Sequence, residues 1–264
     1  MPENGEIEEK CMQVIRKLLF GASIEDIRKK FILNSGKVVC KIESLIKTQM
    51  KAYIHMDAKS IPDVMAAICF AEHQGQWNLF PDFEYKDFFI EHFQVTSSIQ
   101  NRKGAHYSRF RGCFDSEIAS PKACETKVGE YGKENHSLSN LHDSIKLNLV
   151  KHIDKYHAKG KEYKQGIFVL DYHDNGIMIK KPDNEDIPYL LGEDKKALGV
   201  IWDLLRTMSV NTTVVFRNAH TVEIIAAECM PKLIETLPDE IIWQEIGMII
   251  IGISEKAGGF KVRD

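Results

Sequence analysis

The sequence contains no apolar run long enough to cross a membrane and no closely spaced pair of cysteines. Its longest apolar run, 246–253, has the length of a buried strand, whereas a transmembrane helix needs about 18 or more apolar residues. The six cysteines are scattered, so no CxxC spacing indicates a zinc site or a disulfide framework. The N-terminus lacks the charged and apolar regions of a signal peptide. We therefore expect a cytoplasmic protein with reduced cysteines and no membrane partner.

Several motifs of common enzyme classes are also missing. There is no Walker loop and no GxGxxG, which gives no support to a P-loop NTPase or a dinucleotide-binding enzyme. There is no GxSxG elbow of an α/β-hydrolase. Internal repeats and low-complexity linkers are absent as well, which leaves an ordinary globular chain of 264 residues.

The net charge of −3 gives no sign of a polyanionic partner, but the charge is unevenly distributed. Residues 10–59 hold eleven Lys and Arg against four Asp and Glu. This local excess indicates either a solvated helix surface or a face that contacts nucleic acid.

Residues 5–56 have an all-helical pattern. Ser23 and Asp26 have the spacing of a capping box before a helix at 24–31. A turn at 34–36 precedes a second helix at 37–50. This outline fits a helix-turn-helix, and it also fits a helical hairpin that never touches DNA. We define 1–58 as a helical N-terminal segment.

From residue 59 to 264 the pattern alternates between helices and strands, which predicts an α/β domain with a mixed sheet flanked by helices. We expect helices at 61–73, 141–156, 193–208 and 221–237, the last interrupted at Pro231. We expect two strands within 77–95 and others at 166–172, 177–180, 212–217 and 246–253. The strand 177–180 is expected to pair with 166–172 across Asn175-Gly176. Residues 97–140 exceed an ordinary connection, which indicates a mobile segment or a functional lid.

The stretch 80–95 carries the most chemical information. Asp82 stands beside Pro81, and Glu91 follows nine residues later within a strongly apolar strand. If the two strands pair around the polar bend 84–87, both carboxylates converge at one edge of the sheet. Hard oxygen ligands at such a point suit Mg²⁺, which activates water for phosphodiester hydrolysis. The structural alternative is turn chemistry for Asp82 and an ion pair, for example with a helix lysine, for Glu91.

The string Pro81-Asp82-Phe83, followed by Ile90-Glu91-His92-Phe93, resembles the core of the PD-(D/E)XK nuclease superfamily. It is similar to variants in nuclease-like modules of superfamily-one helicases and in small bacterial endonuclease-like proteins. The resemblance covers about residues 60–175, including the helix before the hairpin and the helix and strand after it. It implies a restriction-endonuclease-like fold, Mg²⁺- or Mn²⁺-dependent hydrolysis of nucleic acid, a restriction or phage-defence role, and a homodimer.

The resemblance also implies the site residues. Asp82 and Glu91 would bind the metal, and Glu72, at the end of the preceding helix, matches an additional glutamate ligand of some members. The motif lysine is missing, because its position is occupied by Phe93. Candidates to replace that lysine, or to help catalysis from nearby, are Lys86, Lys146, Lys151 and Gln94. Strand alternation points Gln94 to the face opposite Glu91.

A basic and aromatic segment directly follows the hairpin. Tyr107 and Phe110 lie among its basic residues, an arrangement that suits phosphate contact and base stacking. The basic residues are Arg102, Lys103, His106, Arg109 and Arg111. Together with Lys151 they are the candidate nucleic-acid contacts, with DNA expected rather than RNA. The alternative is an exposed polar loop.

Two other functions remain open at this point. The missing lysine favours a catalytically inactive nuclease-fold module that binds nucleic acid or serves in assembly. The N-terminal helical outline favours a helix-turn-helix DNA-binding regulator with an α/β sensor domain.

Overall fold

The computed structural model describes most of the chain. The described residues are 4–20, 52–75, 80–98, 100–101, 104–105, 128–131, 136–159, 162–172, 174, 176–181, 186–218, 221–245 and 248–251. The expected helices at 24–31 and 37–50 lie outside them.

A mixed seven-stranded sheet forms the centre of the molecule, in the order β1-β12-β11-β8-β4-β3-β2. Its strands are β1 (Ala52–His55), β2 (Glu72–His73), β3 (Phe83–Tyr85), β4 (Phe88–Val95), β8 (Gln165–Tyr172), β11 (Asn211–Arg217) and β12 (Val222–Ala226). The three central strands β4, β8 and β11 run parallel, and β3 pairs antiparallel with β4. The expected α/β fold with a mixed central sheet and flanking helices is confirmed at this level.

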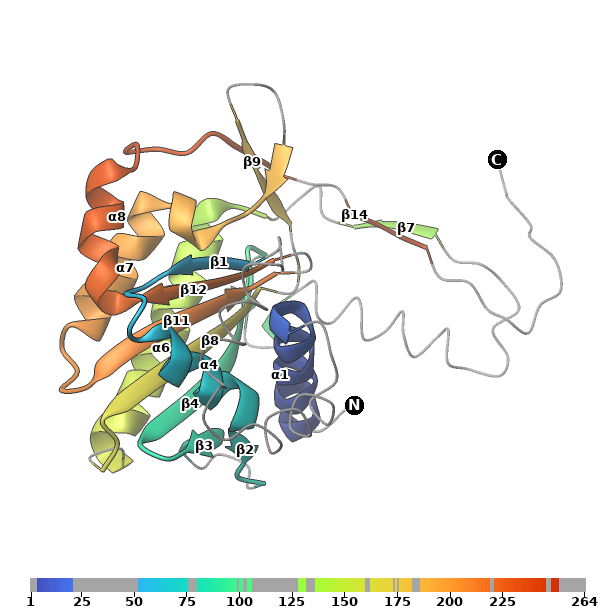
Figure 1. Cartoon of the computed structure of the whole chain (residues 1–264). Coiled ribbons are helices and arrows are strands. Elements are labelled where there is room, and N and C mark those ends of the chain that lie inside the picture. Colours follow the sequence, from blue (N-terminus) through green and yellow to red (C-terminus); the bar gives the residue numbers. More distant parts are fainter. Residues whose placement is uncertain are drawn as a thin grey trace, which may run out of the picture.

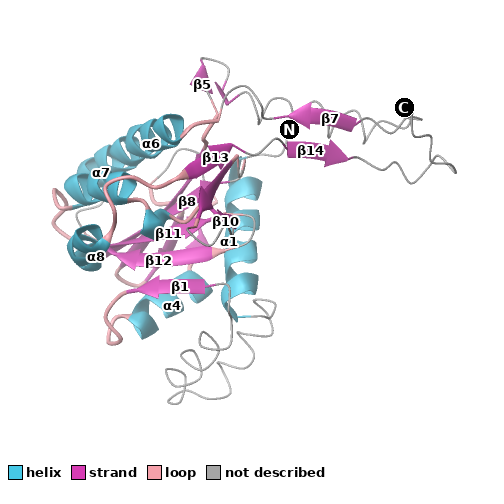
Figure 2. Cartoon of the chain, turned by 90° about the horizontal axis from the view of Figure 1, so that it is seen from above, coloured by secondary structure: helices cyan, strands magenta, loops and turns pink. Residues whose placement is uncertain are grey.

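Helices cover both faces of this sheet (Figures 1 and 2). α1 (Asn4–Phe20) and α4 (Ile61–Phe70) cover what we call the α1 face, where they share an apolar core with Ile90, Ile167 and Val215. α6 (Leu138–Lys159), α7 (Lys195–Leu205) and α8 (Met230–Thr236) cover the opposite α6 face. Because side chains alternate along a strand, neighbouring residues of β4 belong to different faces.

The helix over 141–156 is confirmed as the core of α6. Its predicted inner residues Leu141, Ile145 and Leu149 are fully buried, and Ile153 is nearly so. The predicted strands 166–172 and 212–217 are confirmed as β8 and β11. The α7 helix begins after the short 3₁₀ turn η1 (Leu191–Glu193), with Asp194 as its N-cap accepting from the Ala197 backbone N–H.

Several short ladders lie beside the main sheet. β9 (Ile177–Lys180) pairs with β10 (Asp186–Pro188) and with β13 (Trp243–Glu245). β14 (Met248–Ile251) pairs with β7 (Val128–Tyr131), and Figure 1 shows this ladder extending away from the seven-stranded sheet. β5 (Gln100–Asn101) pairs with β6 (Gly104–Ala105).

Four sequence predictions are wrong in these elements. Residues 52–55 form β1 rather than helix, and this strand lies in the main sheet, so the boundary at 58 does not separate it from the α/β core. The helix 61–73 ends at Phe70, and Glu72 lies in the edge strand β2. The predicted helix 221–237 begins instead as the strand β12 at residues 222–226, followed by the 3₁₀ turn η2 (Ala227–Cys229). Pro231 stands in the first turn of α8 and does not interrupt a helix. β9 does not pair with β8, because β4 and β11 already occupy both edges of β8.

None of the helices in the described part of the chain is both long enough and apolar enough to span a membrane.

Candidate metal site

The β3–β4 hairpin brings the two predicted carboxylates together. In its register Phe83 lies opposite Ile90, so Asp82 stands opposite Glu91. Residues directly opposite each other on paired strands project to the same side of a sheet. The expected convergence of Asp82 and Glu91 is therefore present, on the α6 face.

The environment of Glu91 is unusual for a carboxylate, because the side chain is completely buried. One of its oxygens, Oε2, contacts the Nδ1 atom of His152 and the Nζ atom of Lys155, the latter at 3.2 Å. Its other oxygen, Oε1, is buried and has no hydrogen-bond partner among the residues that the structure describes. A buried polar atom without a partner costs roughly 1–3 kcal/mol, and more when it belongs to a charged group. Oε1 is thus a free ligand atom inside the site.

Helix α6 supplies both partners of Glu91. His152 and Lys155 stand three residues apart, a spacing that puts side chains on one face of a helix. The buried residues Leu149 and Ile153 hold this part of α6 against the sheet. The His152 ring also stacks on Phe93, with 4.7 Å between the ring centroids, which fixes its orientation beside Glu91.

Asp82 lies at the partly exposed side of the site. Its Oδ2 atom accepts a hydrogen bond of 2.7 Å from the backbone N–H of His92. Burial, followed by the neighbouring charge of Glu91, raises the pKa of Asp82 to about 7. Burial disfavours the ionised carboxylate and Glu91 adds a negative charge beside it, and a bound cation would offset both effects.

These groups have the arrangement of a metal-ligand set. Asp82, Glu91 and His152 each offer one ligand atom, and these atoms all lie within 4.8 Å of one another. Two carboxylate oxygens suit Mg²⁺ or Mn²⁺. The imidazole nitrogen extends the range toward later transition ions such as Fe²⁺ and Zn²⁺. The residues present therefore fit the cation that the resemblance implies.

The other predicted members of the site lie elsewhere. Glu72 is exposed on the edge strand β2, because α4 ends before it. Lys86 is exposed in the bend, and its Nζ atom lies 5.0 Å from the centre of the Tyr85 ring. Gln94 is exposed at the end of β4, and Lys146 is exposed on α6. None of these four belongs to the ligand set.

The expected nucleic-acid contacts are only partly described. Lys151 lies on the exposed side of α6. Arg102, Lys103, His106, Arg109 and Arg111 all lie outside the described residues.

Two site residues were not predicted from the sequence, His152 and Lys155. A signal for them existed, since both lie in the confirmed helix after the hairpin. The candidates considered there, Lys146 and Lys151, are exposed on the solvent side of the helix. Choosing Lys155 requires knowing how α6 is rotated against β4.

A second polar network closes the C-terminal end of β4. The carboxylate of Asp174 accepts hydrogen bonds from the backbone N–H groups of Ser97 and Ser98, at 3.0 and 3.3 Å. The Ser97 hydroxyl contacts the Tyr172 hydroxyl at 2.9 Å and Nδ1 of His136 at 2.7 Å. Asp174 approaches the same Nδ1 atom, at 3.7 Å. A Ser-His-Asp relay uses both ring nitrogens, so this arrangement is a structural clamp at the strand end.

Comparisons with protein-family models, with curated proteins and with solved structures found no match to this chain.

Proposed function

We propose that this chain is a metal-dependent nuclease of the PD-(D/E)XK type, which hydrolyses phosphodiester bonds of nucleic acid at Asp82 and Glu91. The observation that carries the proposal is the ligand set itself. Two carboxylates and an imidazole converge beside the hairpin, and the buried Glu91 presents an oxygen that makes no hydrogen bond to any group in the described part of the chain.

The order of elements around the site supports the same proposal. α4 precedes the β3–β4 hairpin, and α6 and β8 follow it, with β8 parallel to β4. This is the order of helix, catalytic hairpin, helix and strand on which the resemblance to the superfamily rests. The order of elements and the pairing of β4 with β8 do not depend on Asp82 or Glu91, so they support the proposal separately from the motif residues.

The chain's own residues have distinct roles in this proposal. Asp82 and Glu91 would hold the cation, and His152 would serve as a third ligand. When bound, a divalent cation would lower the pKa of a coordinated water and neutralise charge on the phosphate. Lys155 has its Nζ atom 3.2 Å from Glu91, so it brings a positive charge to the place where the motif lysine is missing. That charge is positioned to stabilise the phosphate and to orient the attacking water.

The test is cleavage of supercoiled plasmid DNA in Mn²⁺ and in Mg²⁺ by the full chain. We expect cleavage that depends on the metal and that falls by more than about 100-fold in Glu91→Gln, since the loss of groups that merely orient metal ligands costs 10–100-fold. Glu72→Gln is the matched control and should leave cleavage unchanged, because Glu72 is exposed and outside the ligand set. Absence of cleavage with every divalent metal, or full activity of Glu91→Gln, would overturn the enzymatic proposal.

One observation favours a rival, the catalytically inactive module of the same fold. The ion pair between Lys155 and Glu91 compensates the buried charge without any metal. This rival predicts DNA binding that weakens steeply with salt and that is the same with chelator and with Mn²⁺. The proposed enzyme instead predicts cleavage, with a restriction or phage-defence role as its biological setting and duplex DNA as its expected substrate.

A further inference from the structure

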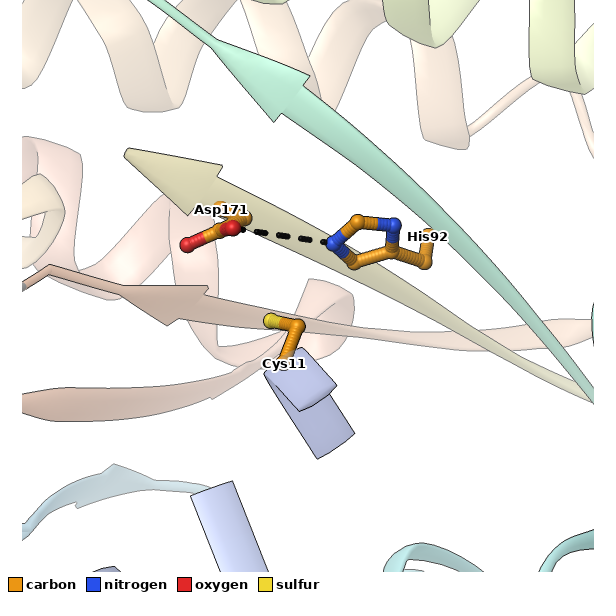
Figure 3. Close-up of side chains that lie close together, drawn as sticks. All are labelled: Cys11, His92 and Asp171. Atoms are coloured by element: carbon orange, nitrogen blue, oxygen red, sulfur yellow. Dashed lines mark ion pairs between the residues drawn. The ribbon is translucent and has the colours of Figure 1, made fainter. Parts of the chain in front are cut away.

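A separate cluster of potential metal ligands lies on the α1 face of the sheet. Cys11 of α1, His92 of β4 and Asp171 of β8 converge there, with ligand atoms all within 4.8 Å of one another. Each of the three residues is less than a tenth exposed. Figure 3 shows His92 and Asp171 on neighbouring strands, with the Cys11 sulfur directed toward them from the helix.

The parallel strands explain why these residues meet. β4, β8 and β11 run in the same direction, so their carboxyl ends share one edge of the sheet. His92 and Asp171 lie toward that edge, and ligand sites in open α/β sheets gather at the carboxyl ends of strands. Cys11 approaches them from α1, because Met12 and Ile15 pack this helix into the apolar core of the α1 face.

His92 directs a buried ring nitrogen into the cluster. Its Nε2 atom makes no hydrogen bond of ordinary length to any residue that the structure describes. It forms an ion pair with Oδ2 of Asp171 only at 3.8 Å, which is longer than a hydrogen bond. Buried polar atoms nearly always have a closer partner, so a nitrogen that faces a carboxylate and a thiol at this spacing points to a ligand bound among the three groups.

The carboxylate of Asp171 is held in place from its far side. The Nη1 atom of Arg217, on β11, donates to Oδ1 of Asp171 at 2.5 Å, which leaves Oδ2 for the cluster. Such outer contacts orient metal ligands.

We propose that Cys11, His92 and Asp171 form a binding site for one zinc ion, distinct from the Asp82–Glu91 site on the other face. A thiolate and an imidazole select Zn²⁺ over Mg²⁺, and a carboxylate oxygen is an accepted third ligand. Three protein ligands leave the fourth tetrahedral position for water. The site would fasten α1 to the sheet, and it does not depend on the proposed nuclease activity.

Cobalt substitution tests this site and separates it from the other one. Co²⁺ added to the chelator-treated full chain should give a thiolate-to-cobalt charge-transfer band and the visible bands of tetrahedral cobalt. Cys11→Ala should abolish the charge-transfer band. Cys229→Ala should retain it, because Cys229 lies outside the cluster. Glu91→Gln should also retain it, since the Asp82–Glu91 site contains no thiolate.

A second variant distinguishes the loss of a metal ligand from misfolding caused by Cys11→Ala. Asp171→Asn keeps the size of the side chain and should bind Co²⁺ at least ten-fold more weakly, while its circular dichroism spectrum stays that of the parent. Zinc at about 100 times its Kd for this site should raise the Tm of the parent by roughly 5–10 °C more than that of Cys11→Ala. A parent without a thiolate band, or a band that survives in Cys11→Ala, would overturn the proposal.

Discussion

The two oxygens of Glu91 differ in their surroundings, and this difference defines the candidate site at the scale of single residues. Oε2 contacts His152 and Lys155, whereas Oε1 has no hydrogen-bond partner within the described ranges. A carboxylate arranged in this way can keep its ion pair and still bind a cation. The site therefore does not require the ion pair with Lys155 to break before a metal enters.

Lys155 is expected to act in place of the missing motif lysine. We predict that Lys155→Met lowers the rate of plasmid cleavage by 10² to 10³-fold, the cost of removing one group that stabilises transition-state charge. Lys159→Met is the matched control on the same helix, and it should change the rate less than ten-fold because Lys159 is exposed at the end of α6. Equal effects of the two substitutions would refute a specific role for Lys155.

Glu223 gives a prediction about stability that is independent of either metal site. This side chain is buried in β12 and accepts hydrogen bonds from the backbone N–H groups of Leu191 and Gly192, at 2.5 and 2.9 Å. Burial outweighs these bonds and raises its pKa to about 7. The folded state thus retains a proton that the unfolded state releases at lower pH. Its stabilising contribution is full below the ordinary pKa of glutamate and is lost as the pH rises toward 7.

Glu223→Gln should remove this pH dependence. The measurement is the free energy of unfolding in urea at about pH 5 and pH 8. On going from pH 5 to pH 8, this free energy should rise by roughly 2 kcal/mol for the variant relative to the parent. Parallel stability profiles of the two proteins would mean that Glu223 is ionised in the fold throughout.

How far the site could be predicted depended on sequence distance. Asp82 and Glu91 were accessible because one short hairpin places them opposite each other. His152 and Lys155 come from a helix whose rotation the sequence did not determine. Cys11, His92 and Asp171 come from three elements far apart in the chain, so no spacing pattern revealed them.

At the scale of elements, the contact between β4 and β8 is especially tight. A Cβ atom at Gly166 would lie 2.3 Å from the Phe89 ring, and that ring is fully buried and stacked on Tyr156. We predict that Gly166→Ala destabilises the fold by about 1–3 kcal/mol through overpacking. The measurement is the free energy of unfolding in urea.

Gly199 provides a control of opposite sign. It lies within α7, and a Cβ atom there would meet nothing within 4 Å. Gly199→Ala should therefore stabilise the protein by about 0.5–1 kcal/mol, since alanine loses less backbone entropy in a helix. Destabilisation by Gly199→Ala, or a neutral Gly166→Ala, would contradict the packing described for these elements.

The elements that were predicted wrongly share a physical cause. Residues 222–226 were assigned to a helix together with 230–236, although Val222, Ile224 and Ile225 are β-branched and favour a strand. Pairing with both β1 and β11 decides the matter, and these contacts are distant in sequence. The turn before β9 suggested that β9 pairs with β8, but both edges of β8 are already paired with its parallel neighbours. α6, β8 and β11 were predictable because their own periodicity is strong.

At the scale of the whole molecule, one sheet separates two polar clusters of different chemistry. The alternation of β4 sends Glu91 to the α6 face and His92 to the α1 face. The carboxylate cluster is rich in oxygen and lies partly at the surface, whereas the Cys11–His92–Asp171 cluster is closed and contains a thiol. A single strand thus contributes to two sites that should prefer different metals.

Binding of a divalent cation by Asp82 and Glu91 is tested most directly by anomalous diffraction. The crystals are those of the full chain soaked with Mn²⁺. We predict a manganese peak within bonding distance of an oxygen of Asp82 and of Oε1 of Glu91, at about 2.0–2.3 Å, which is absent in crystals of Glu91→Gln. At saturating Mn²⁺, the absence of a peak between these two carboxylates would contradict cation binding there. A crystal in which Glu91 contacts only Lys155 and His152 would contradict it as well.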